Sequence, residues 1–396
     1  MLFRSFRHII ELAVAALHPM TGSFRKDIMT ITMSGVLSAL QRRLILAEKN
    51  PDIDWLNLVE NVPQWPAGEV PAGIVHVPGT SYEASAGNEA LLAAIADREN
   101  SLHDASVSPS MVLVTCGAMH GLGLVFRQLR AQGLCEILVE SPIFRGVYDA
   151  AVAAGLTVTT MDGAAVEGVA NFSARSGQSG LYLNRPANPH GAVLSEEEKQ
   201  GLVDLAAAGV PVVLDATYDG FNYRENPVHL TADAALPGLY VVNSLSKNYG
   251  LPGERIGWIL STPRNVAVLT AQLEWETVCV GRAAQAFAAQ VIRSHPAPLR
   301  ERVRRGRESF AQQVHLLGID EYRLPEGGTQ AWLDLGITYV EDFADGLLRH
   351  GLIVTSSSNY YPSTDGFIRF PLGVDDDVII RGLEAISIAK KEWQHR

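Results

Sequence analysis

The sequence predicts an α/β fold, a three-layer αβα sandwich with a mostly parallel sheet, together with a smaller α+β domain built from both chain ends. From about residue 75 onward, short apolar runs alternate with helix-like segments, which is the pattern of strands and crossover helices in a parallel sheet. The chain has 396 residues, 47% of them hydrophobic and 19% charged, which is enough for one large and one smaller domain.

Six apolar runs are expected to form buried strands. They cover residues 111–116, 136–140, 180–184, 210–216, 239–245 and 255–261. Helix-like patterns lie between them at residues 118–133, 144–155, 195–208 and 262–294. In sheets of this kind ligands bind at the carboxyl ends of the strands, and most of the motifs described below directly follow a strand.

Composition divides the chain into a large domain at residues 80–294 and two flanking segments, 33–79 and 295–396, which we assign to the smaller domain. The first flank opens helix-like and becomes rich in proline and glycine, whereas the second combines a charged helical pattern with strand signals. Residues 1–32 are expected to be an N-terminal extension of unclear role. They begin basic and then apolar, somewhat like a signal peptide, but Glu11 interrupts the apolar run.

Charge and cysteine content exclude several classes of protein. The formal net charge of −11 argues against a nucleic-acid-binding protein, because such proteins usually carry a basic patch or excess. No stretch reaches the roughly 20 apolar residues of a membrane-spanning helix. Cys116, Cys135 and Cys279 form no CxxC pair, so we expect buried thiols in a cytoplasmic enzyme, with neither disulfides nor a metal site.

Lys247 lies in an unusual setting, in the segment NSLSKNYGLPGERIGW at residues 243–258. A lysine becomes a useful nucleophile only when desolvation or nearby cations lower its pKa, and its best-known partner is an aldehyde such as pyridoxal phosphate. That cofactor also needs an anion site for its phosphate, a carboxylate facing its pyridine nitrogen and a flat apolar cover for its ring. The sequence contains a candidate for each of these features.

Candidates for the phosphate site and the carboxylate follow predicted strands. The amides of Gly117 to Met119 open a helix, and Ser244, Ser246 and Arg255 surround Lys247, so hydroxyl groups and a bidentate guanidinium are available for a phosphate. Asp215 ends a very apolar strand, where a carboxylate is costly unless it meets a cation. The structural alternative for Asp215 is a helix-capping residue.

Together these motifs resemble those of the class I/II aminotransferases, which are fold-type I pyridoxal phosphate enzymes. The similarity runs in chain order over most of residues 80–370, and the combination is highly specific although no single motif is. SLSKNYGLPGERIG (244–257) resembles the family's lysine signature, NRPANPHGAVLS (184–195) its Asn-Pro-x-Asn-Pro-Thr-Gly motif, DATYDGF (215–221) its Asp-x-x-Tyr motif, and ESPIFRG (140–146) the stretch with the ring-stacking aromatic residue.

The resemblance implies a pyridoxal phosphate cofactor and a role for each matching residue. Lys247 would form the Schiff base and move the substrate proton, and Asp215 would pair with the pyridine nitrogen. Tyr218 and Asn188 would hydrogen-bond the phenolic oxygen, with Asn188 also beside the substrate, and Phe144 would stack on the ring. The phosphate would be held by Gly117, Ala118, Met119, Ser244, Ser246 and Arg255.

Two further matches concern the substrate and the assembly. Arg369, in GFIRFPLG, matches the arginine that binds the substrate α-carboxylate, and its apolar neighbours favour an inward-facing strand position over a surface ion pair. Tyr82, in YEASAG, matches the tyrosine that reaches a phosphate across a dimer interface. The resemblance thus implies an α-amino acid and a 2-oxo acid as substrates, and a homodimer with shared sites.

Several residues depart from the family pattern. His190 stands where the family usually has threonine, and is either an additional acid or base or a turn residue. Arg185 replaces a small or apolar residue, and Thr329 and Gln330 stand where many relatives have apolar or aromatic residues. These departures leave the reaction specificity open.

Transamination through the Lys247 Schiff base is our first interpretation. The alternative on the same fold is a lyase or cyclase that eliminates, replaces or closes a ring on a modified amino acid. A transcription regulator is disfavoured because the roughly 40 residues ahead of the fold lack a basic helix-turn-helix pattern. A non-catalytic relative is disfavoured by the joint presence of Lys247, Asp215, Tyr218, Asn188, Arg255 and Arg369.

Overall fold

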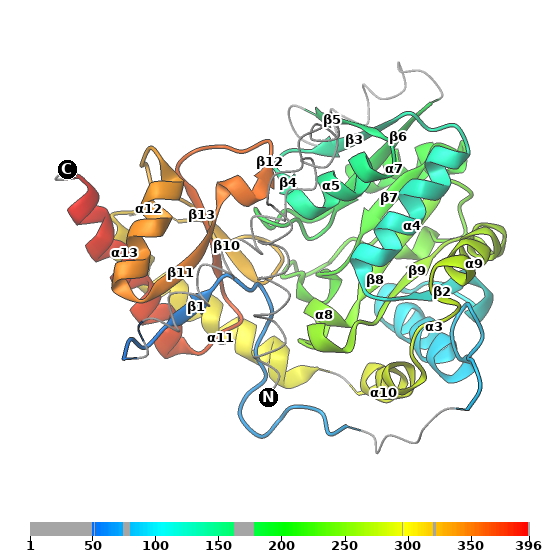
Figure 1. Cartoon of the computed structure of the whole chain (residues 1–396), viewed down its shortest axis with the longest axis horizontal. Helices are drawn as coiled ribbons and strands as arrows, with labels where there is room; N and C mark the ends of the chain where they lie inside the picture. The colour runs from blue at the N-terminus through cyan, green and yellow to red at the C-terminus, as the bar shows by residue number, and fades with distance from the viewer. Residues whose placement is uncertain are drawn as a thin grey trace, which may run out of the picture. The chain divides into compact units, whose positions relative to one another are not determined.

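Two larger sheets with their associated helices, and a short two-stranded ribbon, make up the described chain (Figure 1). The structure is a computed structural model that describes residues 50, 52–73, 80–161, 178–294, 296–319 and 322–394. The predicted N-terminal extension and the helix-like start of the 33–79 segment lie outside these residues.

The larger sheet has seven strands in the order β2-β9-β8-β7-β6-β3-β5. Neighbouring strands are parallel except that β9 runs antiparallel to β2 and β8. All six predicted strands are present with ends that differ by at most two residues, whereas β5 was not predicted. The strands are β2 (Val112–Thr115), β3 (Glu136–Glu140), β5 (Thr157–Met161), β6 (Ser179–Asn184), β7 (Val212–Asp215), β8 (Leu239–Ser244) and β9 (Gly257–Leu260).

Helices cover both faces of this sheet. Successive side chains of a strand point to opposite faces, so each strand contributes to two cores. Leu113, Val213 and Val242 pack under α4, α5 and α9, whereas their chain neighbours Val112, Val212 and Val241 pack under α3, α7 and α10. The helices are α3 (Glu89–His103), α4 (Ala118–Ala131), α5 (Arg145–Ala153), α7 (Glu196–Ala207), α9 (Pro263–Thr277) and α10 (Arg282–Arg293). The predicted αβα sandwich is confirmed.

The helical prediction needs two corrections. The segment predicted as helical over 262–294 forms two helices, because Val278 adopts a positive φ of 62° and ends α9 before α10 begins after Gly281. Helix α3 was not predicted. Its buried face includes Arg98, Glu99 and His103, and these charged residues obscure the apolar periodicity.

The smaller sheet joins segments from both ends of the described chain. Its strand order is β1-β11-β13-β10, and Leu56 of β1 lies opposite Leu352 of β11 in a parallel pair. Leu58, Phe310 and Phe370 belong to its separate hydrophobic core. The elements are β1 (Leu56–Leu58), β10 (Gln330–Asp334), β11 (Leu352–Ser356), β13 (Phe367–Pro371), α11 (Ala297–Gln313), α12 (Val340–Leu347) and α13 (Asp376–Gln394). The domain boundaries at residues 80 and 294 stay predictions.

A short two-stranded ribbon connects the two parts. β4 (Ile143–Phe144), which directly follows the large sheet's β3 region, pairs with β12 (Tyr360–Tyr361) from the smaller part. Phe144 lies opposite Tyr360 in this ribbon. Residues that lie more than two hundred positions apart are thus held at one place, beside the site described below.

The prediction that the cysteines are buried is wrong. Cys116 and Cys135 are exposed and Cys279 is partly exposed, all as free thiols. Cys116 follows β2 and Cys135 precedes β3, so both lie at strand ends and outside the buried part of the sheet.

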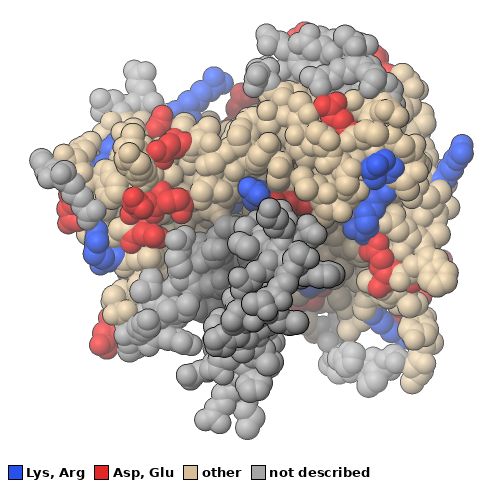
Figure 2. All heavy atoms as spheres, turned by 45° about the horizontal axis from the view of Figure 1, so that its top comes forward, with Lys and Arg blue, Asp and Glu red and all other residues tan. Residues whose placement is uncertain are grey.

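Surface charge and helix composition indicate whether nucleic acids or membranes are suitable partners. On the face shown in Figure 2, the described basic side chains are interspersed with acidic ones. Within the described part of the chain, no helix combines the length and apolar character that a membrane span requires.

Candidate active site

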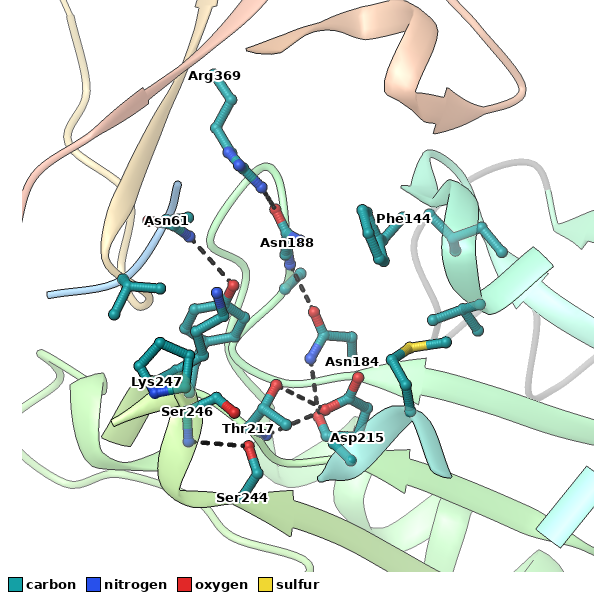
Figure 3. A pocket seen from close by; sticks show the side chains of 18 of the residues that line it. Asn61, Phe144, Asn184, Asn188, Asp215, Thr217, Ser244, Ser246, Lys247 and Arg369 are labelled. Carbon is teal, nitrogen blue, oxygen red and sulfur yellow. Dashed lines mark hydrogen bonds between the residues drawn. The ribbon is translucent and has the colours of Figure 1, made fainter. Parts of the chain in front are cut away.

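A cavity of about 540 Å³ lies where the carboxyl ends of β3, β6, β7 and β8 face the smaller sheet. This volume is in the range of small-molecule sites. Figure 3 shows that labelled side chains from both sheets point toward one another there. The predicted site residues that line it are Ala118, Met119, Phe144, Asn188, Asp215, Tyr218, Ser244, Ser246, Lys247, Arg255 and Arg369.

Lys247 is carried by α8 (Leu245–Asn248), a single turn that directly follows β8. The hydroxyl of Ser244 caps this turn by accepting a hydrogen bond from the amide of Ser246 at 3.3 Å. Burial lowers the pKa of Lys247 to about 7, and the positive charge of Arg369 contributes. The lysine therefore holds an amine that is substantially unprotonated near neutral pH.

Asp215 is the last residue of β7 and is buried. One carboxylate oxygen accepts hydrogen bonds from the amide and hydroxyl of Thr217 at 3.1 and 2.8 Å, and the other accepts one from the Tyr182 hydroxyl at 3.0 Å. Burial raises the pKa of Asp215, and these hydrogen bonds oppose the rise. Sequence analysis missed Tyr182 and Thr217, although the position of Thr217 two residues after Asp215 was a local signal for this contact.

Tyr218 and Asn188 are fixed by polar contacts from distant segments. Asn61, which sequence analysis missed, donates from Nδ2 to the Tyr218 hydroxyl at 3.2 Å. The side-chain oxygen of Asn188 accepts hydrogen bonds from Tyr360 at 2.9 Å and Arg369 at 3.3 Å. Because this oxygen is occupied, the NH₂ group of Asn188 is the part available as a donor to a ligand.

Donors for an anion gather where β2 ends and α4 begins. Gly117 adopts a positive φ of 78° and provides no side-chain cap for the first amides of α4. A Cβ at this position would lie only 2.4 Å from Nη2 of Arg255, so the close approach of the guanidinium to the helix start requires glycine. Together with Ser244 and Ser246, these groups form a site suited to a phosphate.

Arg369 lies on β13 and points into the cavity (Figure 3). Its Nη2 donates to the carbonyl oxygen of Val59 at 2.6 Å and its Nη1 to the Tyr360 hydroxyl at 3.0 Å. Among the described residues, its buried Nε has no hydrogen-bond partner. A buried, oriented guanidinium with a free donor is suited to bind a carboxylate.

Residues 76–386 match the family model described as aminotransferase class I and II. The chain belongs to this family. It is 38% identical to the 3-methylarginine biosynthesis aminotransferase ArgM of Streptomyces arginensis, over 89% of this chain and 96% of that protein. It is 35% identical to the L-aspartate:5-guanidino-3-methyl-2-oxopentanoate transaminase of Pseudomonas syringae pv. syringae, over 93% and 97% of the two chains.

Solved structures agree with the fold of this aminotransferase. The aspartate aminotransferase of Thermotoga maritima superimposes with a TM-score of 0.77 over 91% of this chain and 98% of that one, at 20% identity. An aspartate aminotransferase from Thermus thermophilus bound to maleate gives 0.77 over 93% and 100%, at 21% identity. Transamination is confirmed as the activity, and no finding favours the lyase or cyclase alternative.

The residues of the aminotransferase cavity fit pyridoxal phosphate. Lys247 supplies an amine that loses its proton near neutral pH, and Asp215 supplies a buried carboxylate. The uncapped start of α4 and the Arg255 guanidinium supply anion donors, and Phe144 supplies an aromatic side chain on the cavity wall. This set matches the chemical groups of the cofactor.

Tyr82 is not part of the cavity. Its side chain is 82% exposed, and its role at a dimer interface stays a prediction. Within the single chain, the ion pair of the neighbouring Glu83 with Arg282, at 3.1 Å, holds this segment against the start of α10.

Three residues that depart from the family pattern have structural contacts. The ring Nδ1 of His190 accepts a hydrogen bond from the amide of Ala192 at 3.4 Å, which supports its interpretation as a turn residue on the cavity wall. The Thr329 hydroxyl donates to the side-chain oxygen of Asn61 at 2.8 Å. Gln330 accepts from Asn61 at 2.5 Å and donates to the carbonyl of Ala187 at 3.0 Å, so it links Asn61 to the loop of Asn188.

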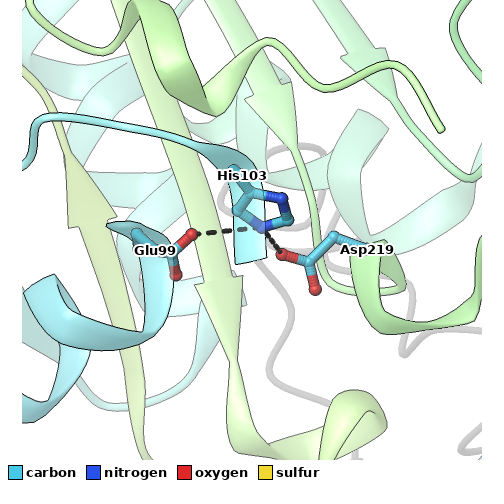
Figure 4. Close-up of side chains that lie close together, drawn as sticks. All are labelled: Glu99, His103 and Asp219. Atoms are coloured by element: carbon cyan, nitrogen blue, oxygen red, sulfur yellow. Dashed lines mark hydrogen bonds and ion pairs between the residues drawn. The ribbon is translucent and has the colours of Figure 1, made fainter. Parts of the chain in front are cut away.

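A second polar cluster lies away from the cavity lining. Glu99, His103 and Asp219 bring atoms of metal-ligand type within 4.8 Å of one another (Figure 4). The guanidinium of Arg98 forms ion pairs with Glu99 at 2.6 Å and Asp219 at 2.7 Å and so offsets part of their negative charge. We therefore interpret the cluster as a buried ion network, and the absence of a metal site stays a prediction.

Proposed function

We propose that this aminotransferase binds pyridoxal phosphate at Lys247 and acts on arginine-type amino acids and their 2-oxo acids, which carry a guanidino group. The cofactor assignment depends above all on the Lys247 amine. Its pKa is lowered to about 7, and it lines the same cavity as Asp215 and Arg255. The substrate class is supported by the two relatives above, whose names refer to 3-methylarginine and to 5-guanidino-3-methyl-2-oxopentanoate.

Bound pyridoxal phosphate supplies an electron-accepting ring that weakens the bonds at the substrate Cα. Lys247 would hold the cofactor through Nζ, and its amine would move a proton to and from the substrate Cα. Asp215 keeps the pyridine nitrogen protonated, because a buried carboxylate is stabilised by a facing cation. The Tyr218 hydroxyl and the NH₂ group of Asn188 would donate to the phenolic oxygen of the cofactor, and Phe144 would cover its ring.

The two ends of the bound molecules are held by separate cations. Arg255, with Ser244, Ser246 and the first amides of α4, binds the phosphate. Arg369 binds the α-carboxylate of the substrate through its guanidinium, whose Nε is the free donor, and thereby orients the Cα proton for transfer. Because Arg369 is itself fixed by Val59 and Tyr360, little ordering is needed when the substrate enters.

We further propose a homodimer in which Tyr82 contributes to the phosphate site of the partner subunit. Exposed apolar side chains near the start of α4 support this assembly. Trp275 of α9 is 92% exposed, Met119 at the start of α4 is 38% exposed, and Glu276, the neighbour of Trp275, contacts His120 of α4 at 3.4 Å. A second copy of the chain would cover these side chains.

We place the enzyme in the cytoplasm, because exposed free thiols such as Cys116 and Cys135 stay reduced there. Fractionation of the source cells should recover the activity with cytosolic marker enzymes. Recovery with another compartment would contradict this location.

Covalent trapping tests the cofactor assignment. Borohydride reduction of the holoenzyme, followed by proteolysis, should add the cofactor's mass to the peptide that contains Lys247. Lys247→Ala should lose both this label and transamination, whereas Lys391→Ala, on the exposed face of α13, should keep both. Labelling of a different lysine in the wild-type protein would refute the assignment.

A panel of acceptors tests the substrate class. The enzyme is incubated with L-aspartate as amino donor and 5-guanidino-2-oxopentanoate, its 3-methyl form or 2-oxohexanoate, and the amino acid products are measured by mass. We expect the guanidino acceptors to be converted with the higher kcat/KM. Equal conversion of 2-oxohexanoate would show that the substrate class is wrong while leaving the cofactor assignment intact.

A further inference from the structure

Glu60 lies between two residues that hold the catalytic side chains. The carbonyl of Val59 accepts a hydrogen bond from Arg369 at 2.6 Å, and the side chain of Asn61 donates to Tyr218 at 3.2 Å. Val59 and Asn61 are buried, whereas Glu60 is exposed and lines the cavity. The contacts of Val59 and Asn61 thus hold the backbone of this segment at the cavity, while the Glu60 carboxylate is accessible to a ligand.

Among the described residues that line the cavity, three carry carboxylates: Glu60, Glu140 and Asp215. Glu140 forms an ion pair with the buried Arg185, and Asp215 accepts hydrogen bonds from Thr217 and Tyr182. Glu60 forms no hydrogen bond or ion pair with a described residue. Its negative charge nevertheless acts on the cavity, since it raises the pKa of Lys247 against the lowering effect of burial and Arg369.

We propose that Glu60 determines the specificity for the substrate side chain by binding a cationic, guanidino-type group at its end. This proposal rests on the proposed function, in which Arg369 holds the α-carboxylate and leaves the side chain to extend along the cavity wall. A guanidinium presents two parallel N–H groups that match a carboxylate, whereas an ammonium makes a single-point contact and a neutral end makes no charged contact.

Family membership does not imply this role. Glu60 precedes residues 76–386, which match the family model, and it is not part of the phosphate, ring or α-carboxylate contacts described above. The Glu60 carboxylate should also disfavour substrates with acidic side chains, because two negative charges at one site repel each other. The proposal therefore orders three kinds of substrate: guanidino first, neutral next and acidic last at the same pocket.

The test compares Glu60→Gln with Glu69→Gln in the holoenzyme. Glu69 is an exposed carboxylate of the same chain segment that lies outside the cavity, so it is a matched control. The kcat/KM values are measured for L-arginine, L-norleucine and L-aspartate as amino donors. Glu60→Gln should lower kcat/KM for L-arginine about tenfold to a hundredfold, mainly through KM, the usual range for a lost charge-assisted contact.

The same variant should leave L-norleucine within about twofold and raise kcat/KM for L-aspartate, because only the charge at the side-chain end differs. Glu69→Gln should change none of the three. An unchanged value for L-arginine in Glu60→Gln, or an equal loss for all three donors, would overturn the proposal.

Calorimetry gives a readout that does not depend on turnover. The holoenzyme is titrated with 2-hydroxy-5-guanidinopentanoate and with 2-hydroxyhexanoate, which lack the reacting amino group. Glu60→Gln should weaken only the first ligand, by about tenfold or more. If both the wild-type enzyme and Glu60→Gln prefer the guanidino ligand, the role proposed for Glu60 is wrong and the proposed substrate class stands. If wild-type enzyme shows no preference, the substrate class itself fails.

Discussion

Lys247 satisfies two conditions that an amine needs to attack an aldehyde, since it is held in a cavity and loses its proton near neutral pH. Burial lowers its pKa to about 7, Arg369 and Arg255 lower it as well, and Glu60 and Asp215 oppose them. The unprotonated amine is the nucleophile. The rate at which cofactor-free protein takes up pyridoxal phosphate should therefore rise with pH through about 7 and then level off.

Stopped-flow absorbance of the cofactor-free protein across neutral and alkaline pH measures this inflection. In Glu60→Gln the inflection should move to lower pH, because a negative charge that raises the lysine pKa is gone. A rate that keeps rising toward pH 10.5, the ordinary pKa of lysine, would contradict the effect of burial.

The site residues that could be predicted from the sequence share one feature, a charged side chain in an apolar sequence context. Lys247, Asp215 and Arg369 are charged side chains at or within apolar strand patterns, and such positions are costly without a partner. Asn61 and Tyr182 carry no such signal. Asn61 reaches Gln330 across 269 positions of sequence, and Tyr182 reads as an ordinary core residue of β6, so only the folded chain reveals their contacts.

At the scale of elements, a buried ion network joins α3 to the loop that follows Asp215 and to the turn of Lys247. Asp219 accepts hydrogen bonds from Arg98 at 2.7 Å, Asn248 at 2.6 Å and Asn243 at 2.9 Å. Breaking one partner of a buried pair leaves an uncompensated charge. Asp219→Asn should therefore lower the free energy of unfolding by about 3–5 kcal/mol in urea titrations.

Asp233→Asn is the matched control for this prediction. Asp233 pairs with Lys199 at 3.3 Å, and both side chains are partly exposed, so its loss should cost about 1 kcal/mol or less. If the two substitutions lower the free energy of unfolding equally, the buried network does not contribute to stability as proposed.

The network also predicts the direction of a pH effect. Burial alone would raise the pKa of Asp219, but Arg98 and His103 outweigh it and hold the pKa well below its usual range. A carboxyl group with a depressed pKa in the folded state stabilises the fold above its unfolded pKa, about 3.9, and this stabilisation is lost as the pH falls below that value. The difference in stability between wild type and Asp219→Asn should therefore shrink in acid.

The same elements show what sequence patterns can predict. Strands β6, β7 and β8 are continuous apolar runs, because helices cover both of their faces, and all three were predicted. The edge strand β5 is only partly buried and has no apolar run, while α3 buries Arg98, Glu99 and His103 on the face that packs. Periodicity fails where charges are buried, as in α3, or where an edge strand is only partly buried, as in β5.

At the scale of the whole molecule, the cavity is assembled from both sheets, and we expect a second subunit to complete it. Lys247 and Asp215 come from the large sheet, whereas Arg369 and Asn61 come from the smaller part of the chain. Tyr82 is 82% exposed and Trp275 is 92% exposed on the single chain. We expect a second copy of the chain to cover both side chains.

Subunit complementation tests the shared site. Lys247→Ala and Tyr82→Ala homodimers should each have strongly reduced activity, because every site lacks either its amine or the partner subunit's phenol. After the two variants are mixed and allowed to exchange subunits, each mixed dimer should contain one intact site, built from Lys247 of one protomer and Tyr82 of the other. Random exchange then restores about a quarter of the wild-type activity. Sedimentation should show a dimer throughout, and a dimer without restored activity would place Tyr82 outside the partner's site.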